Sequence, residues 1–465
     1  MYLDEKNVWN GEMPGDLRAV VHRLSKKEIP CYVVGPAVRD ALLSGTMERT
    51  QRIDLLALGG NIQKVEKVLD SSSASNFFIG HPERLRRATS AFNVQASQDG
   101  EILRKLVISA VADERELRDE MEKREVTVNA VALSGTGTVY DPFGGLPDLE
   151  AQRVRPVIPP SQAFVQKPLF LVKVAKHVAF HGYEADSETE EMALRYATNI
   201  LDVQPERIRP ELERLLVNLF PDRGLDFLQR TGLLPLLLPE VQNLVGFSES
   251  CEVHHKDIWE HTKKVVARSK PTPAIRWAAL LHDIGKVWTR SIDSEGRVHF
   301  FRHEDLGAIF FGGIATRLAL DDRLVDRVRF LIRNHSRINM YATDWTDSAV
   351  RRLVRETGEY FEELLALSRA DITSRQERRV EELNRLLDEL GRRVEEIRTE
   401  DSKKPVLPKG AGAIIMQHFG IPAGPLVGHL KDLLEQAIQD GRQPPDRPVE
   451  EYLGFLQELI RKAGE

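Results

Sequence analysis

Six residues between positions 261 and 371 carry side chains that commonly bind divalent metal ions. They are His261, the adjacent pair His282 and Asp283, His303, His335 and Asp371. Imidazoles and carboxylates suit Mn, Fe, Co, Ni or Zn, and carboxylate and water ligands also tolerate Mg. An ion with open coordination positions can lower the pKa of a bound water and polarise a phosphoryl oxygen. These residue types predict a site for one or two divalent ions that is suited to phosphate chemistry.

The surrounding sequence predicts helices that could bring these ligands together. Each ligand lies within or at the end of an apolar segment with helical spacing, such as AALLHDIGK around His282 and Asp283. One side chain per helix can then point into a shared bundle interior. Both residues of an adjacent His-Asp pair can reach one ion, and the carboxylate can bridge to a second. A single histidine beside an apolar run is usually a hydrogen-bonded core residue, but six ligand-type residues in this order favour a metal site.

The order of the ligands resembles the H…HD…D signature of the HD superfamily of phosphohydrolases. In this sequence the signature falls on His261, His282, Asp283 and Asp371, and His303 and His335 stand where two-metal members carry further ligands. The resemblance implies that His282 and Asp283 are catalytic. Lys286, one turn further on, could contact a phosphate, although a solvated or ion-paired lysine is an equally good interpretation.

Length and composition describe an ordinary folded protein. The chain has 465 residues, of which 42% are hydrophobic and 29% charged, with a net charge of −6. This length predicts about three domains. The acidic balance argues against a strongly basic nucleic-acid protein, although it allows a local basic groove. We expect no signal peptide and no membrane span. Cys31 and Cys251 are far apart in unrelated contexts, so we expect reduced thiols in the cytoplasm.

The pattern of elements predicts an α+β chain. Helices are expected at 17–30, 36–45 and 61–72, and strands at 31–35, 53–59, 105–111 and within 128–141. From about residue 160 onward strand signals vanish, helical periodicity dominates, and a long charged helix is expected at 378–404. The predicted domains are an α/β domain at 1–155, a helical neck at 156–247, a helical domain with the metal ligands at 248–385, and a helical tail at 386–465.

Motifs along most of the chain resemble one enzyme family. VVGPAVRDALLSG is similar to a family VGG-x-VRD-x-LLG motif, with Gly35, Arg39, Asp40 and Gly45 matching. KREVTVNAVAL resembles RRDFTINA, and GIPAGPLVGHLKDLLEQAIQDGR resembles a family tail element. The chain therefore resembles the class II tRNA nucleotidyltransferase (CCA-adding) and bacterial poly(A) polymerase family, in its long form with an HD domain.

This resemblance carries expectations about fold, ligands and partners. It implies a nucleotidyltransferase-like α/β domain followed by an all-helical neck, an HD-type helical domain and a helical tail. It also implies phosphate or nucleotide binding at Gly35, Arg39 and Arg124, with a structural ion pair as the alternative role for Arg39. The expected partners are tRNA or another RNA 3′ end, or nucleotides, with no role for DNA.

Several transferase positions depart from the family pattern. The family holds two metal ions with an Asp-x-Asp, where this chain has Arg52-Ile53-Asp54, and an arginine is a fixed cation. Ser109 stands where a third acid would be sought, and Glu125 replaces an aspartate. In the nucleotide-reading helix Lys167 replaces an acid and Phe170 an arginine, although Phe170 could stack on a base. These departures predict an inactive transferase site.

Three functions follow from these observations. The favoured hypothesis is a metal-dependent HD phosphohydrolase or phosphodiesterase that acts on nucleotides or RNA 3′ ends, on a transferase-like scaffold. The second is an active CCA-adding or poly(A) nucleotidyltransferase. The third is a non-catalytic RNA-binding protein.

Overall fold

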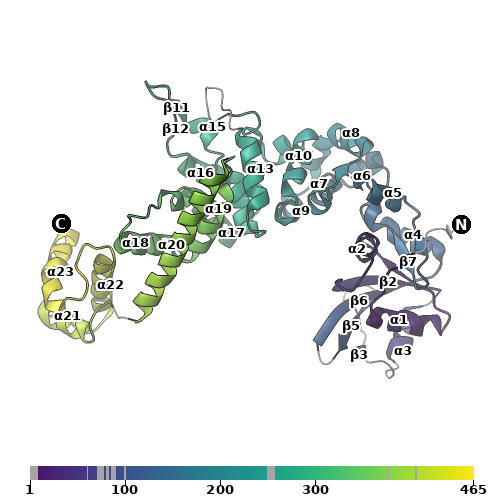
Figure 1. Ribbon diagram of the computed structural model, residues 1–465, viewed down its shortest axis with the longest axis horizontal. Coiled ribbons are helices and arrows are strands. Elements are labelled where there is room, and N and C mark those ends of the chain that lie inside the picture. The colour runs from purple at the N-terminus through teal and green to yellow at the C-terminus, as the bar shows by residue number, and fades with distance from the viewer. Residues whose placement is uncertain are drawn as a thin grey trace. The chain divides into compact units, whose positions relative to one another are not determined.

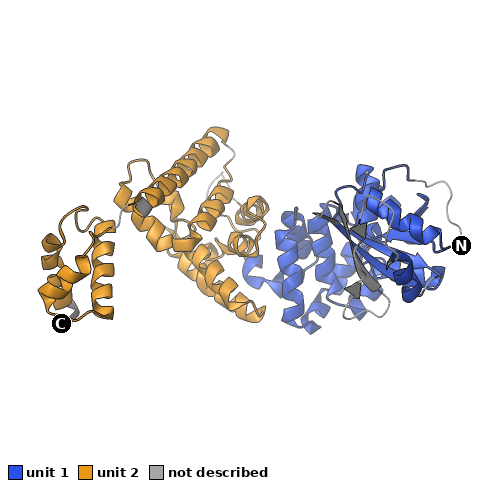
Figure 2. Cartoon of the chain, turned by 90° about the horizontal axis from the view of Figure 1, so that it is seen from below, with its two compact units in different colours: residues 1–242 blue, residues 243–465 orange. Residues whose placement is uncertain are grey.

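The computed structural model describes residues 9–59, 61–70, 78–79, 83–84, 91–98, 101–248, 257–374, 376–403 and 406–464. These residues form two compact units, Met1–Gln242 and Asn243–Glu465, which Figure 2 shows in blue and orange. Cys251 and part of the segment that precedes His261 lie outside the described residues. The finer domain boundaries at 155, 247 and 385 stay predictions.

A mixed sheet organises the first half of unit 1 (Figure 1). Its strand order is β3-β5-β6-β2-β1-β7-β8, with β4 paired to β5. Strand β2 runs parallel to β6 and antiparallel to β1. The strands are β1 (Cys31–Val34), β2 (Arg52–Leu58), β3 (Phe78–Ile79), β4 (Glu83–Arg84), β5 (Ala91–Gln98), β6 (Glu101–Val111), β7 (Ala132–Ser134) and β8 (Val139–Tyr140).

The two faces of strand β2 pack against different parts of the unit. Ile53, Leu55 and Ala57 belong to the core that includes residues of α1 (Gly15–Ser25), α2 (Pro36–Ser44) and α3 (Ile62–Asp70). Leu56 lies on the opposite face, in a core with residues of α4 (Glu114–Glu122). Because side chains alternate along a strand, Arg52 and Asp54 share the face of Leu56. This alternation places both polar residues at one end of the same sheet face.

Helices complete unit 1. The short strands β9 (Arg153–Val154) and β10 (Glu184–Ala185) pair in parallel among them. A buried stripe on α7, including Leu171, Val174 and Val178, lets this helix pack against α9 and α10. The helices are α5 (Gly145–Glu150), α6 (Pro160–Gln166), α7 (Phe170–His181), α8 (Ser187–Arg195), α9 (Pro205–Val217), α10 (Pro221–Arg230), α11 (Leu233–Leu237) and α12 (Pro239–Gln242).

Unit 2 is a helical assembly with one small hairpin. The hairpin joins β11 (Arg290–Ile292) to β12 (Val298–Phe300). The long helix α20 buries Leu387, Leu390 and Val394 at three- and four-residue steps, which lets a highly charged sequence pack against α18 and α19. The helices are α13 (Ile258–Arg268), α14 (Pro273–Leu281), α15 (Lys286–Thr289), α16 (His303–Arg317), α17 (Asp322–Asn334), α18 (Asp347–Thr357), α19 (Phe361–Asp371), α20 (Glu377–Lys403), α21 (Ala411–Phe419), α22 (Pro425–Gln439) and α23 (Val449–Gly464).

The expected α+β organisation is confirmed, with corrections in detail. Strand signals do not vanish after residue 160, because β10 and the β11–β12 hairpin follow it. The stretch 128–141 holds two short strands preceded by the 3-10 helix η1 (Thr127–Asn129). Strands β3, β4 and β5 were not predicted. Among the described residues no helix is both long and apolar enough to cross a bilayer.

Candidate functional site

The structure brings all six predicted ligands of unit 2 into one neighbourhood. Every one of them lies on a helix or directly after one, as the spacing predicted. His261 is on α13, His282 and Asp283 follow α14, His303 begins α16, His335 follows α17, and Asp371 ends α19. A bundle interior therefore collects donors from five helices.

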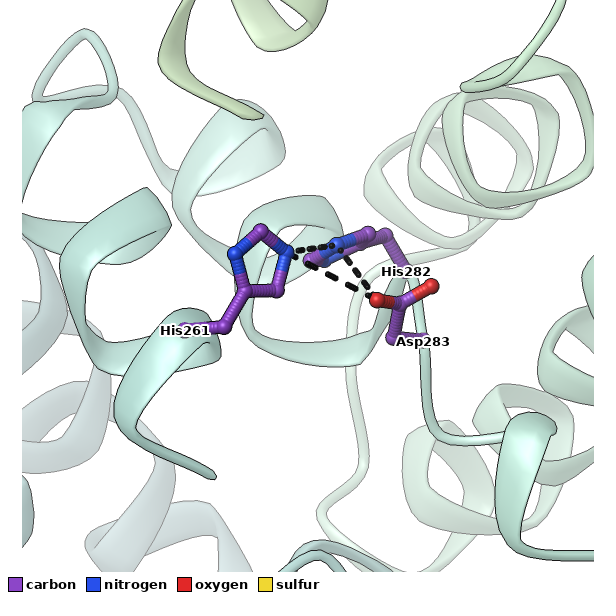
Figure 3. A group of neighbouring side chains, drawn as sticks. All are labelled: His261, His282 and Asp283. Atoms are coloured by element: carbon purple, nitrogen blue, oxygen red, sulfur yellow. Dashed lines mark hydrogen bonds and ion pairs between the residues drawn. The ribbon is translucent and has the colours of Figure 1, made fainter. Parts of the chain in front are cut away.

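The first group of donors surrounds the Oδ2 side of Asp283 (Figure 3). His261 Nε2 lies 3.7 Å and His282 Nε2 3.2 Å from Asp283 Oδ2. The two Nε2 atoms are 3.3 Å apart, and Asp371 Oδ1 lies 3.0 Å from His261 Nε2. His261, His282 and Asp283 are almost fully buried. Donor atoms this close together can all reach a single ion.

The second group faces the other oxygen of the same carboxylate. His303 Nε2 lies 3.7 Å and His335 Nε2 3.9 Å from Asp283 Oδ1. The two histidine Nε2 atoms are 3.4 Å apart. Asp283 thus stands between two sets of potential ligands, each with a carboxylate oxygen and two imidazoles.

Hydrogen bonds fix the orientation of all four imidazole rings. In each ring Nδ1 lies within hydrogen-bond distance of an oxygen, which leaves Nε2 facing the centre. The partners are Thr373 Oγ1 at 2.7 Å for His261, Ala279 O at 2.8 Å for His282, Phe300 O at 2.9 Å for His303 and Ile332 O at 2.7 Å for His335. Rings held in this way present one nitrogen to an ion without further reorganisation.

The main chain at Gly285 lies very close to the start of α16, and this contact keeps the two groups of donor atoms together. Gly285 lies so near the start of α16 that a Cβ on it would fall 2.1 Å from His303 O. A glycine is required there because any side chain would push α16, and with it His303, away from Asp283. The glycine of HDIGK is therefore a packing residue of the site.

The charges of the site influence one another strongly. Burial alone would lower the pKa of His282, but the neighbouring carboxylates of Asp283 and Asp371 raise it to about 10. Burial opposes ionisation of Asp283, but the charges of His282 and Lys286 hold its pKa well below the usual range. Burial lowers the pKa of His335 to about 4. A divalent cation could take the place of the protons that balance these carboxylates.

Lys286, which the sequence predicted to be catalytic, is ion-paired with a candidate metal ligand. Lys286 Nζ lies 3.0 Å from Asp283 Oδ2, one turn away on the chain. The ammonium also lies over the ring of Phe300, 5.4 Å from its centroid. These contacts match the ion-paired interpretation of Lys286, and its contact with a phosphate stays a prediction.

The predicted transferase residues lie on one face of the sheet in unit 1. Arg52 Nε is 3.2 Å from Asp54 Oδ1, and Arg124 Nη1 is 2.6 Å from Asp54 Oδ2. Both oxygens of the carboxylate are therefore occupied by guanidinium groups. The side chain of Arg52 is 67% exposed, whereas those of Asp54 and Arg124 are about one-fifth exposed.

The neighbouring strand adds no second acid to this face. In the parallel pairing of β2 and β6, Arg52 lies opposite Lys105, Asp54 opposite Val107 and Leu56 opposite Ser109. We call Arg52, Asp54, Lys105, Ser109 and Arg124 the head face. Asp54 is its one carboxylate, and the sheet register places none beside it among the side chains described on β2 and β6. A two-metal site does not fit these residues.

Gly35 and Arg39 have well-defined local roles. Gly35 precedes α2 with φ 83° and ψ −152°, and a Cβ there would lie 2.9 Å from Arg124 Nη1. Arg39 is buried, and its guanidinium donates to Asp40 Oδ1 and, at 2.8 Å, to Asn129 Oδ1. These bonds match the structural alternative for Arg39, and phosphate binding by Gly35, Arg39 and Arg124 stays a prediction.

A charged cluster that the sequence did not reveal joins Glu125 to helix α7. Lys173 Nζ lies 2.6 Å from Glu125 Oε1, while Lys176 Nζ and His177 Nε2 lie 3.1 and 2.8 Å from Oε2. Burial opposes ionisation of Glu125, but the hydrogen bonds from His177 and Lys173 bring its pKa well below the usual value. The spacing of the three cations along one helix face was the available signal.

Positions 167 and 170, which depart from the family's nucleotide-reading helix, differ in how far they are exposed to solvent. Phe170 is 8% exposed and packs on Phe164 with ring centroids 6.5 Å apart. Its ring belongs to the core, so the idea that it stacks on a base is not supported by this position. Lys167, by contrast, is exposed.

Three family models match successive parts of the chain. They describe a poly(A) polymerase head domain at residues 31–155, a probable RNA- and SrmB-binding site of polymerase A at 182–244, and an HD domain at 258–376. The fold and the matched segments define a protein with a nucleotidyltransferase-type head and an HD domain.

Two relatives of known function show the family to which the chain belongs. The chain is 30% identical to the A-adding tRNA nucleotidyltransferase of Deinococcus radiodurans, over 69% of this chain and 75% of that protein. It is 31% identical to the CC-adding tRNA nucleotidyltransferase of Thermus thermophilus, over 71% of this chain and 75% of that protein. The chain belongs to the tRNA nucleotidyltransferase family of CCA-adding enzymes, which confirms the resemblance found in the sequence.

Solved structures agree with this fold. The CCA-adding enzyme of Bacillus stearothermophilus in complex with CTP aligns with a TM-score of 0.60 at 20% identity, covering 97% of this chain and 98% of that one. The Thermotoga maritima CCA-adding enzyme complexed with tRNA aligns with a TM-score of 0.55 at 17% identity, covering 95% and 94%.

The comparisons correct the favoured functional hypothesis. The expectation of an HD phosphohydrolase on an inactive transferase scaffold is wrong, because these relatives, over most of the chain, are named for adding nucleotides to tRNA. The physical reason for the error is that an intact set of ligands indicates where an ion can bind and does not specify a reaction. The second hypothesis, a tRNA nucleotidyltransferase, is the better one.

Proposed function

We propose that this protein acts at the 3′ end of tRNA as a nucleotidyltransferase of its family. The observation that carries the proposal is the identity of 30% and 31% to two tRNA nucleotidyltransferases over about three-quarters of their length. The head retains the sheet, the Gly35 turn and the β2 carboxylate Asp54. A tRNA substrate and reduced thiols would place the protein in the cytoplasm.

The residues of this chain would contribute binding and positioning. Arg52 and Arg124 provide guanidinium groups, which match phosphate oxygens in geometry and charge. Lys173, Lys176 and His177 hold Glu125 and so tie the segment after α4 to helix α7. This tie would keep helix α7 at a fixed distance from the head face while a tRNA end and a nucleotide bind.

We further propose that the HD domain holds one or two divalent ions. His261, His282, Asp283 and Asp371 would hold one, and His303 and His335 would hold a second together with Asp283. The set of imidazoles and carboxylates suits Mn, Fe, Co or Ni, and the carboxylates also accept Mg. A bound ion of this kind supplies charge that polarises oxygen ligands.

A second candidate function is tRNA binding without transfer. The observation that favours it is the engagement of both Asp54 oxygens by Arg52 and Arg124. Nucleotidyl transfer normally uses a pair of ions to stabilise the attacking and leaving oxygens, and the head face offers one carboxylate for them. In this candidate the chain would bind the 3′ end and shield it.

An extension assay separates the two candidates. The full chain is incubated with tRNA lacking its 3′-terminal nucleotides, labelled CTP or ATP, and Mg²⁺, and the products are resolved by length. Extension supports transfer, and Asp54→Ala should remove it, because Asp54 holds the guanidinium groups of Arg52 and Arg124 in place. Saturable tRNA binding without extension supports the second candidate instead.

A further inference from the structure

We propose that the head face binds the phosphate chain of a nucleoside triphosphate without a divalent ion. Arg52, Lys105 and Arg124 would provide the positive charge that metal ions provide where two carboxylates are present. The inference rests on the nucleotide binding implied by the proposed function, and it does not depend on transfer.

The charge balance of the head face supports this inference. The register of β2 and β6 places Arg52 beside Lys105, and Arg124 reaches the same face from the segment after α4. Three cationic side chains therefore share one face of the sheet with the carboxylate of Asp54, and two of them contact it. A site of this composition attracts anions and repels divalent cations.

The contacts of Asp54 argue in the same direction. Arg52 and Arg124 each engage a different oxygen of the carboxylate, at 3.2 and 2.6 Å. To bind a metal ion, Asp54 would have to give up at least one of these two charge-assisted bonds. As a counter-ion, in contrast, Asp54 holds both guanidinium groups on one carboxylate, so they are close together before a ligand arrives.

An anion can reach the head face from solvent. The side chain of Arg52 is two-thirds exposed, so its remaining N–H groups can donate to phosphate oxygens, often in bidentate fashion. Gly35 brings the main chain close to Arg124, since a Cβ at this position would fall 2.9 Å from Nη1. A side chain there would crowd the guanidinium group, and a glycine leaves room beside it.

A polar cavity lies against the segment that leads into strand β2. Its volume is about 640 Å³, and it is lined by Asp40, Ser44, Thr46, Arg49, Thr50 and Gln51. Gln51 directly precedes Arg52, and the carboxylate of Asp40 is already paired with the guanidinium group of Arg39. Cavities of about 300–1,000 Å³ are typical of small-molecule sites. Hydroxyl and guanidinium groups in such a cavity could hold the sugar or the outer phosphates of the same nucleotide.

Calorimetric titration of the full chain with ATP or CTP tests the inference. Each nucleotide is titrated once with EDTA and once with excess Mg²⁺. The dissociation constant should agree within about threefold between the two conditions, and Arg52→Ala should weaken binding about tenfold in both, as expected for loss of one charge-assisted hydrogen bond. Lys27→Ala, which removes an exposed cation beyond the end of α1, should leave the constant unchanged.

The reverse substitution sharpens the test. Arg52→Asp places two carboxylates on one strand face, so binding should become dependent on Mg²⁺. Binding that needs Mg²⁺ in the unaltered chain, absence of binding in both conditions, or binding that Arg52→Ala does not affect would each overturn the inference. Metal-free binding without any extension of tRNA would remove the proposed transfer and leave this inference standing.

Discussion

Arg124 donates from Nη1 to Oδ2 of Asp54 across 2.6 Å, although 70 positions separate the two residues in the chain. The bond ties the segment after α4 to the middle sheet strand β2. It also occupies one oxygen of the head-face carboxylate, while Arg52 occupies the other. This arrangement determines what the head face can bind, and a change at Arg52 should alter its chemistry.

We predict that Arg52→Asp increases Mg²⁺-dependent nucleotide incorporation into tRNA. The substitution removes a cation and creates Asp-x-Asp on one strand face, a carboxylate arrangement that suits two metal ions. The measurement is the rate of extension of tRNA lacking its 3′ end, at several Mg²⁺ concentrations. Arg52→Ala is the matched control, since it removes the cation without adding a ligand, and an equal gain in both variants would contradict the explanation.

Asp283→Ala should remove bound metal from the HD domain entirely. Its two oxygens face the two groups of histidines, so this one substitution affects both potential ion positions. Metal content of the purified chain after dialysis is the measurement. His303→Ala should remove at most the ion of the second group.

The control for this experiment is Asp326→Ala, because that side chain is 76% exposed and lies outside the centre. It should keep the metal content of the unaltered chain. Full metal content in Asp283→Ala, with the helices still folded by circular dichroism, would rule out the proposed ligands.

Glu125→Gln should loosen helix α7 locally. The substitution removes the charge that Lys173, Lys176 and His177 share, and we expect a loss of about 2 kcal/mol for this partly buried cluster. Hydrogen exchange of α7 peptides measures the effect. Glu184→Gln, which alters a 61% exposed carboxylate with surface partners, should change exchange little, and an equal effect of the two variants would contradict the prediction.

The same cluster predicts a pH dependence of local stability. Burial lowers the pKa of His177 from its ordinary value of 6.5. The hydrogen bonds that Glu125 accepts from His177 and Lys173 lower the pKa of Glu125 from its ordinary value of 4.5, although burial opposes this shift. Both groups bind fewer protons in the folded state, so their contribution is present at neutral pH and is lost on acidification. Exchange of α7 in the unaltered chain should accelerate as the pH falls below about 6.5 and again as it falls below about 4.5. Protection that does not depend on pH, after correction for intrinsic exchange rates, would be the contrary result.

Cys31 should be unreactive toward thiol reagents in the folded protein. Its side chain is 4% exposed, and burial raises its pKa to about 12, so almost no thiolate exists at neutral pH. Mass spectrometry after brief alkylation, with and without denaturant, measures the labelling of the peptide that contains Cys31. Labelling at equal rates in both conditions would show that the strand is accessible.

The gathering of the six candidate ligands could largely be predicted from the sequence, because most of them lie at helix ends with helical spacing. His282 and Asp283 follow the apolar run of α14, so their position relative to the interior is determined by local periodicity. The bond between His261 and Thr373 could not be predicted in this way, since it depends on how α13 packs against the end of α19. The requirement for glycine at 285 likewise becomes clear only when α16 is in place.

The head face was predicted less completely. The sequence identified the replacement at Arg52, yet the presence of Lys105 on the same face depends on the register between β2 and β6. These two strands lie about 50 positions apart in the chain, so the local pattern of either strand does not say which residues of the other lie opposite. The role of Glu125 was hidden for the same reason, because its partners lie about 50 positions later on helix α7. The functional hypothesis was wrong because a complete set of candidate ligands in one domain does not determine the reaction, whereas the similarity to tRNA nucleotidyltransferases extends over most of the chain.

The most direct test of the proposed function is extension of tRNA that lacks its 3′-terminal nucleotides, with labelled CTP or ATP and Mg²⁺, by the purified full chain. We predict products lengthened at the 3′ end and their loss in Asp54→Ala. The same preparation should bind the tRNA saturably in a filter assay. Saturable binding with no lengthened product at any nucleotide concentration would contradict the proposal that this protein is a working tRNA nucleotidyltransferase.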